Sequence, residues 1–312
     1  MLTLFTTAKP FRGHFAVIQR NALQSWKRLH PDAEVILFGD DGGSAEVCRE
    51  FGLRHEPDVA RTSGGAIQLD DMFQRAQALA RHDLLCYANC DIIFQDDFIR
   101  ALQLATDAHR EFLLVGRRWD VDMTEPIDFS NPNWQPETRR RTLAAHRQRN
   151  TGWIDYFAFT RCLYGSDVPP LAIGRACWDL WLVWKALAQE KALVDASRVV
   201  MVIHQNHDYS HHPQGSKGVW GGEDTRRNYE LTGGPKHFRG IADATHVITP
   251  DGIQPNPHRL WGLFIRYADR LGRFLFFNVW QPIWFAFLNA TRPLRTVLGL
   301  RSEAIRRPRG EI

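Results

Sequence analysis

Asn89 and Asp91 stand two residues apart between the apolar runs at residues 84–88 and 92–94. On a β-strand, side chains at positions i and i+2 lie on one face, so both would point beyond the same edge of a sheet. An amide oxygen and a carboxylate placed there suit a hard divalent cation that carries a diphosphate. A strand that simply ends in an Asn/Asp turn has the same pattern, so the motif alone favours neither interpretation.

Histidines cluster further along the chain. Four of the thirteen histidines lie between His204 and His212, directly after the apolar residues 199–203. A histidine at a strand end can bind a metal through one ring nitrogen while a neighbour orients the other. If the two strands are neighbours, His204 would complete a cation site with Asp91. The alternative is a hydrogen-bonded polar loop, to which we assign His211 and His212.

Two acidic positions are candidates for a general base. Asp179 lies where a helix over residues 177–189 is expected to begin. Helix capping is the default explanation there, because backbone N–H groups stabilise a carboxylate at a helix start. Beside a bound sugar donor, the same carboxylate could take the proton of an acceptor hydroxyl. Glu223 follows a Gly-Gly turn and allows the same two interpretations.

Apolar patterning places these residues on an α/β fold. The order strand, helix, strand in the first 120 residues predicts a mixed, mainly parallel sheet flanked by helices. Ligands of such sheets bind at the carboxyl ends of the strands, where Thr6, Thr7 and Asp40 also lie. The expected strands are residues 2–6, 35–38, 84–88, 153–160, 191–196 and 198–204, and the expected helices are 15–29, 44–51, 67–79 and 177–189. Residues 119–151 are expected to form an irregular insertion, with Arg139, Arg140 and Arg141 on a solvated helix face or in a substrate loop.

The charge of the chain is unevenly distributed. Residues 258–312 hold ten arginines, no lysine and three acids, a sum of +7 that leaves −3 on the first 257 residues of a chain with net charge +4. Five scattered cysteines without a CxxC pair are typical of reduced thiols. No secretory signal pattern is visible at the start, so we expect a cytoplasmic location.

The basic end of the chain is also rich in aromatic residues. We expect two parts, residues 1–257 and an amphipathic, aromatic helical appendage over residues 258–312. Residues 274–291 are marginal for a membrane span, which needs about 20 apolar residues, and Asn278, Gln281 and Pro282 weaken that interpretation further. Aromatic residues between arginines suit peripheral attachment to an anionic membrane surface, on the cytoplasmic face. Helices packed on the first part or on a second copy are the alternative.

Taken together, the chain resembles the GT-A fold glycosyltransferases over roughly residues 1–235. Thr6-Thr7, Asn89-Cys90-Asp91, Asp179 and His204 stand in that family's order, and residues 204–211 look like a segment of uncharacterised bacterial members. The resemblance implies a Rossmann-like GT-A fold and transfer of a sugar from a nucleotide-diphosphate sugar to a hydroxyl of a glycan or lipid-linked acceptor. The implied cofactor is a divalent cation, Mn²⁺ or Mg²⁺; nucleic acid is not an expected partner.

The resemblance also implies residue roles. Asp91 would bind the cation, with His204, and then His207, as a further metal or phosphate ligand. Asn89 would replace the first acid of the family's Asp-x-Asp motif and, being uncharged, would weaken cation binding. Thr6, Thr7 and Asp40 would surround the nucleotide, with Arg61 near the phosphates. Asp179 is the preferred base, since the motif containing Glu223 precedes the metal histidine in some galactosyltransferases but follows His204 here.

Two other functions are compatible with these residues. A metal-dependent hydrolase could use Asp91, His204 and His207 to hold a cation that activates water, although such sites normally carry more ligands. A non-catalytic scaffold could bind a nucleotide sugar at a membrane, since Asn89 is a change that can accompany lost activity.

Overall fold

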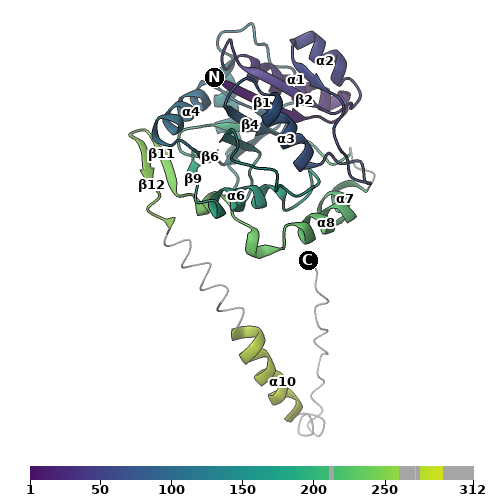
Figure 1. Ribbon diagram of the computed structural model, residues 1–312, viewed down its shortest axis with the longest axis vertical. Coiled ribbons are helices and arrows are strands. Elements are labelled where there is room, and N and C mark those ends of the chain that lie inside the picture. Colours follow the sequence, from purple (N-terminus) through teal and green to yellow (C-terminus); the bar gives the residue numbers. More distant parts are fainter. Residues whose placement is uncertain (211–213, 260–270, 272–274, 291–312) are drawn as a thin grey trace. The chain divides into compact units, whose positions relative to one another are not determined.

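The computed structural model describes residues 1–210, 214–259, 271 and 275–290 (Figure 1). The chain divides into two units, Met1–Arg259 and Leu260–Ile312. In the second unit, a π-helical segment, Phe276–Trp280, continues into helix α10, Gln281–Ala290. Among the described residues, none of the helices has the length and apolar character that crossing a membrane requires. Within residues 274–291, the expected aromatic helix is thus present at the described positions. Residues 274 and 291 lie outside the described residues.

A nine-stranded mixed sheet forms the centre of the first unit, in the order β12-β11-β9-β6-β8-β4-β1-β2-β3. A second sheet of three strands has the order β5-β10-β7. The strands are β1 Leu2–Thr7, β2 Glu34–Phe38, β3 Arg54–Glu56, β4 Leu84–Ala88, β5 Ile92–Ile93, β6 Phe112–Val115, β7 Arg118–Val121, β8 Tyr156–Thr160, β9 Ala192–Asp195, β10 Val202–Gln205, β11 His246–Thr249 and β12 Gly252–Pro255. The helices are α1 Gly13–Lys27, α2 Ser44–Phe51, α3 Leu69–Leu79, α4 Asp96–Ala108, α5 Trp134–Ala145, α6 Trp178–Ala188, α7 Gly215–Gly221 and α8 Glu223–Leu231, with 3-10 turns at Pro235–His237 and Ile241–Asp243.

The predicted α/β architecture is confirmed. Strand β1 lies parallel between β2 and β4, and β9 lies parallel between β6 and β11. The antiparallel exceptions are β8, which joins β4 to β6, and the edge strand β12. Because β1 and β4 run in the same direction, their carboxyl ends meet at one edge of the sheet, where ligands of such sheets bind.

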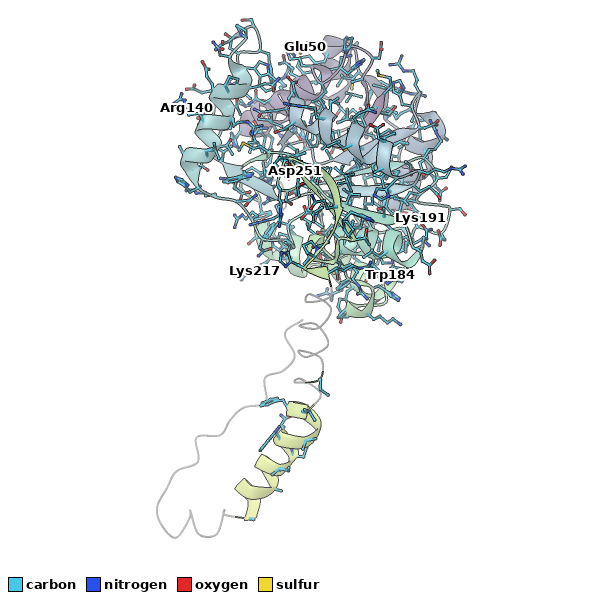
Figure 2. The ribbon with its side chains drawn as sticks, turned by 90° about the vertical axis from the view of Figure 1, so that its left-hand side faces the viewer. Glu50, Arg140, Trp184, Lys191, Lys217 and Asp251 are labelled. Carbon is cyan, nitrogen blue, oxygen red and sulfur yellow. The ribbon has the colours of Figure 1, made fainter. Side chains whose placement is uncertain are left out.

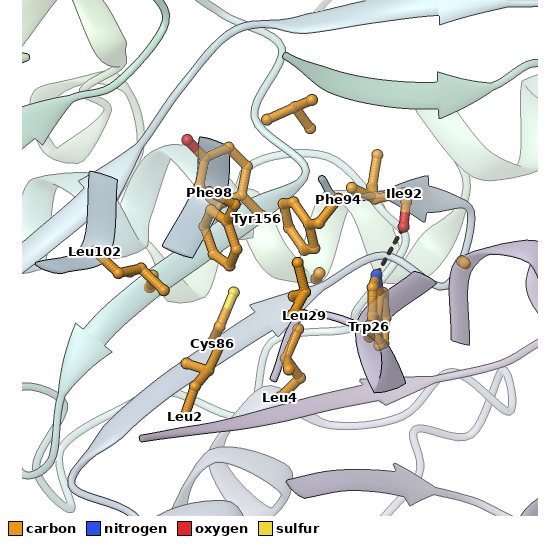
Figure 3. Packing of buried hydrophobic residues seen from close by; sticks show 14 of the residues in the cluster. Leu2, Leu4, Trp26, Leu29, Cys86, Ile92, Phe94, Phe98, Leu102 and Tyr156 are labelled. Carbon is orange, nitrogen blue, oxygen red and sulfur yellow. Dashed lines mark hydrogen bonds between the residues drawn. The ribbon is translucent and has the colours of Figure 1, made fainter. Parts of the chain in front are cut away.

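Helices cover both faces of the large sheet. Alternate residues of β1 point to opposite faces, so Leu2 and Leu4 pack with α1, α2 and α4, whereas Phe5 packs with α3 and α6. Trp26 anchors the first face through a hydrogen bond of 2.8 Å from its indole nitrogen to the carbonyl of Ile92, directly after Asp91 (Figure 3). On the second face, Phe5 makes edge contacts with Phe73 and Tyr87. Full burial of such a ring stabilises the fold by about 1.5–3 kcal/mol.

The expectation of an irregular insertion over residues 119–151 is wrong in two places. Strand β7 begins at Arg118, and α5 spans Trp134–Ala145. Arg139 pairs with Asp97, and Arg141 donates to the carbonyl of Asp122, so both fasten α5 to the domain. Arg140 is exposed on the outer side of the helix (Figure 2). The arginine run therefore belongs to a helix face, as one of the two interpretations held.

The expected strand at residues 198–204 begins only at Val202. The Asp195 carboxylate accepts hydrogen bonds from the backbone and hydroxyl of Ser197, a local bond that favours a turn over a strand. The shorter β10 pairs with β5 and β7 rather than with β4. His204 therefore reaches the Asn89-Cys90-Asp91 segment through the short strand that follows it.

Candidate functional site

A cleft of about 800 Å³ opens at the carboxyl ends of β1 and β4. Seven of the residues predicted from the sequence line it: Thr7, Arg61, Asn89, Asp91, Asp179, His204 and His207. They come from strands, a helix start and loops that are far apart in the sequence. The parallel pairing of β1 with β4, and of β10 with β7, brings these segments to one place.

Asp91, His204 and His207 form a cluster that could hold a cation. One ligand atom from each lies within 4.8 Å of the others. The Oδ2 atom of Asp91 is 3.0 Å from Nε2 of His207 and 3.8 Å from Nε2 of His204. Burial opposes ionisation of Asp91, but the two histidines and Lys9 outweigh it and hold the pKa of this carboxyl well below its usual range.

The cluster fits a divalent cation. The other carboxylate oxygen of Asp91, Oδ1, is buried and has no hydrogen-bond partner within the described part of the chain. A buried carboxylate oxygen is costly unless hydrogen bonds or a metal compensate it. One carboxylate and two imidazoles are a mixed oxygen and nitrogen set, which suits Mn²⁺ better than Mg²⁺, an ion that prefers oxygen ligands.

Asn89 uses its amide within the protein. Its Nδ2 donates to Oδ1 of Asp155 at 2.7 Å, and its Oδ1 accepts from the hydroxyl of Tyr87 at 2.9 Å. Arg118 donates to the other oxygen of Asp155 at 2.6 Å. An ionised aspartate at position 89 could not donate to Asp155, so this hydrogen bond depends on the amide of Asn89.

We expect the Asn89→Asp variant to be less stable than the wild type at pH 8. It would set two carboxylates at the 2.7 Å separation now spanned by a hydrogen bond, and the free energy of unfolding should fall by about 1–3 kcal/mol. The loss should shrink at acidic pH, where the two groups can share a proton. Urea unfolding at pH 5 and pH 8 measures it. Asn89→Ala, which adds no charge, is the control; a stable Asn89→Asp variant with tighter Mn²⁺ binding would contradict the placement of Asn89.

Lys9 is a site residue that sequence reasoning missed. Its Nζ lies 3.3 Å from Nε2 of His207 and 4.7 Å from the ring centre of Phe15. Buried Gln19 fixes the backbone of Lys9 with two hydrogen bonds, of 2.6 and 2.8 Å. Burial lowers the pKa of Lys9, while Asp91 acts in the opposite direction. The only sequence signal was its position, two residues past the end of β1 at the ligand-binding edge.

Asp179 faces the cleft from the first turn of α6. Burial raises its pKa to about 7, the nearby Asp155 carboxylate adds to the effect, and a hydrogen bond from the Leu180 backbone opposes it. The residue at the helix N-cap is Cys177, without a side-chain capping bond. A carboxyl with this pKa is partly ionised at neutral pH and can accept a proton.

Three predicted site residues do not line the cleft. The Thr6 hydroxyl is buried and donates to the carbonyl of Ala88 at 2.6 Å, which joins β1 to β4. Asp40 is exposed, and its neighbour Asp41 lines the cleft instead, paired with Arg61 at 2.8 Å. Gly39 makes that turn possible, since its φ is +93° and a Cβ would meet the Arg61 side chain.

Glu223, the reserve base, is exposed at the start of α8. Its neighbour Asp224 is directed inward, where it accepts a hydrogen bond of 3.1 Å from the Thr62 hydroxyl and lies 3.9 Å from Nε of Arg175. Asp224 alone therefore ties α8 to the loop that contains Thr62. Of the two predicted bases, only Asp179 reaches the cleft.

No protein-family model matches the chain, and no curated protein matches it. Among solved structures, it is similar to S. aureus TarS 1–349 in complex with UDP-GlcNAc, at 14% identity over 74% of this chain and 65% of that chain, with a TM-score of 0.49. TarS 1–349 alone is 11% identical over 65% of this chain and 60% of that chain, with a TM-score of 0.45. The chain is also similar to glucosyl-3-phosphoglycerate synthase from Mycobacterium tuberculosis in complex with Mn²⁺, UDP and phosphoglyceric acid. The two are 15% identical over 75% of this chain and 79% of that chain, with a TM-score of 0.44. The chain spans 60 to 65% of the length of these two TarS chains.

Proposed function

We propose that the chain is a cation-assisted glycosyltransferase of the GT-A type, which moves a sugar from a nucleotide-diphosphate donor to a hydroxyl of a glycan or lipid-linked acceptor. One observation carries the proposal: a single cleft holds a cluster that could bind a cation, Asp91, His204 and His207, and a carboxyl, Asp179, whose pKa is raised to about 7. Displacement at an anomeric carbon needs charge compensation for the leaving diphosphate and a base for the acceptor.

The residues divide into two groups under this proposal. Asp91, His204 and His207 would hold the cation, which when bound supplies positive charge to the leaving diphosphate. Lys9 adds a further positive group beside His207, 3.3 Å away. Asp179 accepts the proton of the acceptor hydroxyl, a task that suits a pKa near the working pH. Arg61, paired with Asp41 at 2.8 Å, adds a basic group to the lining of the cleft.

A donor panel tests the proposal. The full chain is incubated with UDP-, GDP- and dTDP-sugars in the presence of Mn²⁺ or Mg²⁺, and thermal unfolding and nucleotide release are followed. We expect stabilisation and nucleotide release with one donor class, and loss of both in Asp91→Ala. Stabilisation without any nucleotide release would favour a binding scaffold. Silence across the panel would contradict the proposal.

We also propose that residues 258–312 attach the protein to an anionic membrane surface. This segment carries a charge of +7, and its described helical residues expose large apolar side chains: Phe276 at 56%, Trp280 at 65% and Ile283 at 56%. Arginines attract anionic headgroups, while aromatic rings partition into the interface. Such attachment would bring the protein to the surface that holds a lipid-linked acceptor.

Binding to lipid vesicles tests this second proposal. The full chain should co-sediment with phosphatidylglycerol vesicles more strongly than with phosphatidylcholine vesicles. The double variant Phe276→Ser/Trp280→Ser should bind the anionic vesicles at least about 100-fold more weakly, because each buried ring contributes about 1.5–3 kcal/mol and every 1.4 kcal/mol is tenfold. Leu104→Ser, at an exposed position of α4, is the control. Equal binding of both lipids, or an unchanged double variant, would refute membrane attachment.

A further inference from the structure

Strand β7 places a buried carboxylate behind His204. The parallel pairing of β10 with β7 sets His204 directly opposite Asp120, so their side chains share one face of the three-stranded sheet. Oδ1 of Asp120 lies 3.3 Å from Nδ1 of His204, at ion-pair distance, and this buried Nδ1 makes no hydrogen bond within the described part of the chain. The other ring nitrogen of His204, Nε2, faces Asp91, 3.8 Å from its Oδ2. The imidazole therefore stands between two carboxylates, one in the cluster and one behind it.

Asp120 is itself held firmly. It is 1% exposed, and Nε of Arg118 donates to its Oδ1 at 3.0 Å. Arg149 donates to the other oxygen, Oδ2. Two guanidinium groups keep a carboxylate ionised and fix its plane. The negative charge behind His204 is thus both permanent and immobile.

The same arginine links this carboxylate to the donor motif. Arg118 also donates to Oδ2 of Asp155 at 2.6 Å, and Asp155 accepts from the Asn89 amide. A continuous polar network therefore runs from His204 through Asp120, Arg118 and Asp155 to Asn89. The proposed transfer reaction assigns no role to Asp120 or Arg118, although both residues line the cleft.

We propose that Asp120 is a positioning residue for the cation ligand His204. When the cation is bound, Asp120 would accept a hydrogen bond from Nδ1–H of the imidazole, which leaves the lone pair of Nε2 directed at the cation beside Asp91. Metal-bound histidines commonly give their other N–H to a carboxylate in this way, and the partner fixes the tautomer and raises the basicity of the ligand. The inference rests on the cation site of the proposed function, and not on the identity of the sugar donor or acceptor.

A double-mutant cycle tests the inference. Isothermal titration of Mn²⁺ is carried out on the full chain, on Asp120→Asn, on His204→Gln and on the double variant. We expect Asp120→Asn to bind Mn²⁺ about 10–100-fold more weakly, the usual effect of losing such a partner. In the His204→Gln background, Asp120→Asn should have no further effect, because it acts through His204.

Two further variants separate positioning from folding. Asp120→Glu keeps the charge for both arginines but displaces the carboxylate, so Mn²⁺ affinity should still fall while the protein unfolds at a similar temperature. Asp195→Asn, which removes a half-buried carboxylate away from the cleft, should leave Mn²⁺ affinity unchanged. Should Asp120→Asn not fold, Asp120→Glu, with His204→Gln as the second arm, provides the same cycle.

The outcomes are distinct. Unchanged Mn²⁺ affinity in the folded Asp120 variants, or an equal loss with and without His204, would overturn the positioning role. Absence of Mn²⁺ binding by the wild type would overturn the cation site and this inference with it. Mn²⁺ binding that follows the cycle, in a chain that turns over no nucleotide sugar, would refute the proposed function and leave the role of Asp120 standing.

Discussion

Asp91→Ala is expected to abolish the Mn²⁺ dependence of donor turnover and to lower kcat/KM at least about 100-fold, since a metal at a leaving group is worth several kcal/mol. Asp91 is the only carboxylate in the cluster described by the structure. Its Oδ2 faces both histidines, and its Oδ1 has no hydrogen-bond partner among the described residues. The two imidazoles left behind offer neutral ligands without a charge to balance a divalent cation.

Nucleotide release measured against Mn²⁺ concentration checks this result. Asp91→Asn keeps the shape of the side chain and removes only its charge, so it should resemble Asp91→Ala. Asp195→Asn, outside the cleft, should behave like the wild type. If Asp91→Ala retains the Mn²⁺ response of the wild type, the cation is held elsewhere and the assignment of the cluster is wrong.

The substitution Asp179→Asn is expected to have the second large effect on the rate of transfer. Transfer to acceptor should fall by about 10²–10⁴-fold, the usual contribution of a positioned general base, while stabilisation by the donor persists. In the wild type, kcat/KM should rise with pH through about 7, because burial raises the pKa of Asp179 to about 7 and only the ionised carboxyl accepts a proton. The variant should lack this rise. A variant that keeps both its rate and its pH profile would exclude Asp179 as the base.

The same pKa gives an independent expectation for stability. The carboxyl ionises near its ordinary pKa in the unfolded chain but near 7 in the folded protein, so between these values the folded state binds more protons and stability falls as pH rises. Above pH 7 the full penalty of a buried charge remains. Asp179→Asn should therefore be more stable than the wild type at pH 8 and nearly equal at pH 4. Loss of both activity and stability at pH 8 would point to a structural role instead.

The sequence was sufficient for the parallel strands β1, β2 and β4, but it did not predict β3, β6 or β11. Strong apolar periodicity defines β1, α1, β2, α3 and β4, because each buries a continuous face. The structure brings Asp91 and His204 together, although through β5 and not through β4. That route depends on a two-residue strand, too short to leave a periodic signal.

Other parts of the site depended on pairings that a sequence pattern does not show. Strand β7 contains Arg118 and Asp120, which look like surface residues but neutralise each other when buried. Lys9 and Asp155 lie in loops whose partners come from distant segments. At residue 40 the neighbouring Asp41 lines the cleft instead, since the direction of a side chain in a turn depends on local backbone angles, such as the positive φ of Gly39.

Crystals grown with Mn²⁺ and the nucleoside diphosphate that stabilises the chain most would test the central claim directly, through the anomalous scattering of manganese. We predict a manganese peak at ligand distance from Asp91, His204 and His207, with the diphosphate bound to it in the cleft that Asp179 faces. A diphosphate bound without manganese at this cluster, or a manganese peak that leaves Asp91 uncoordinated, would contradict the account.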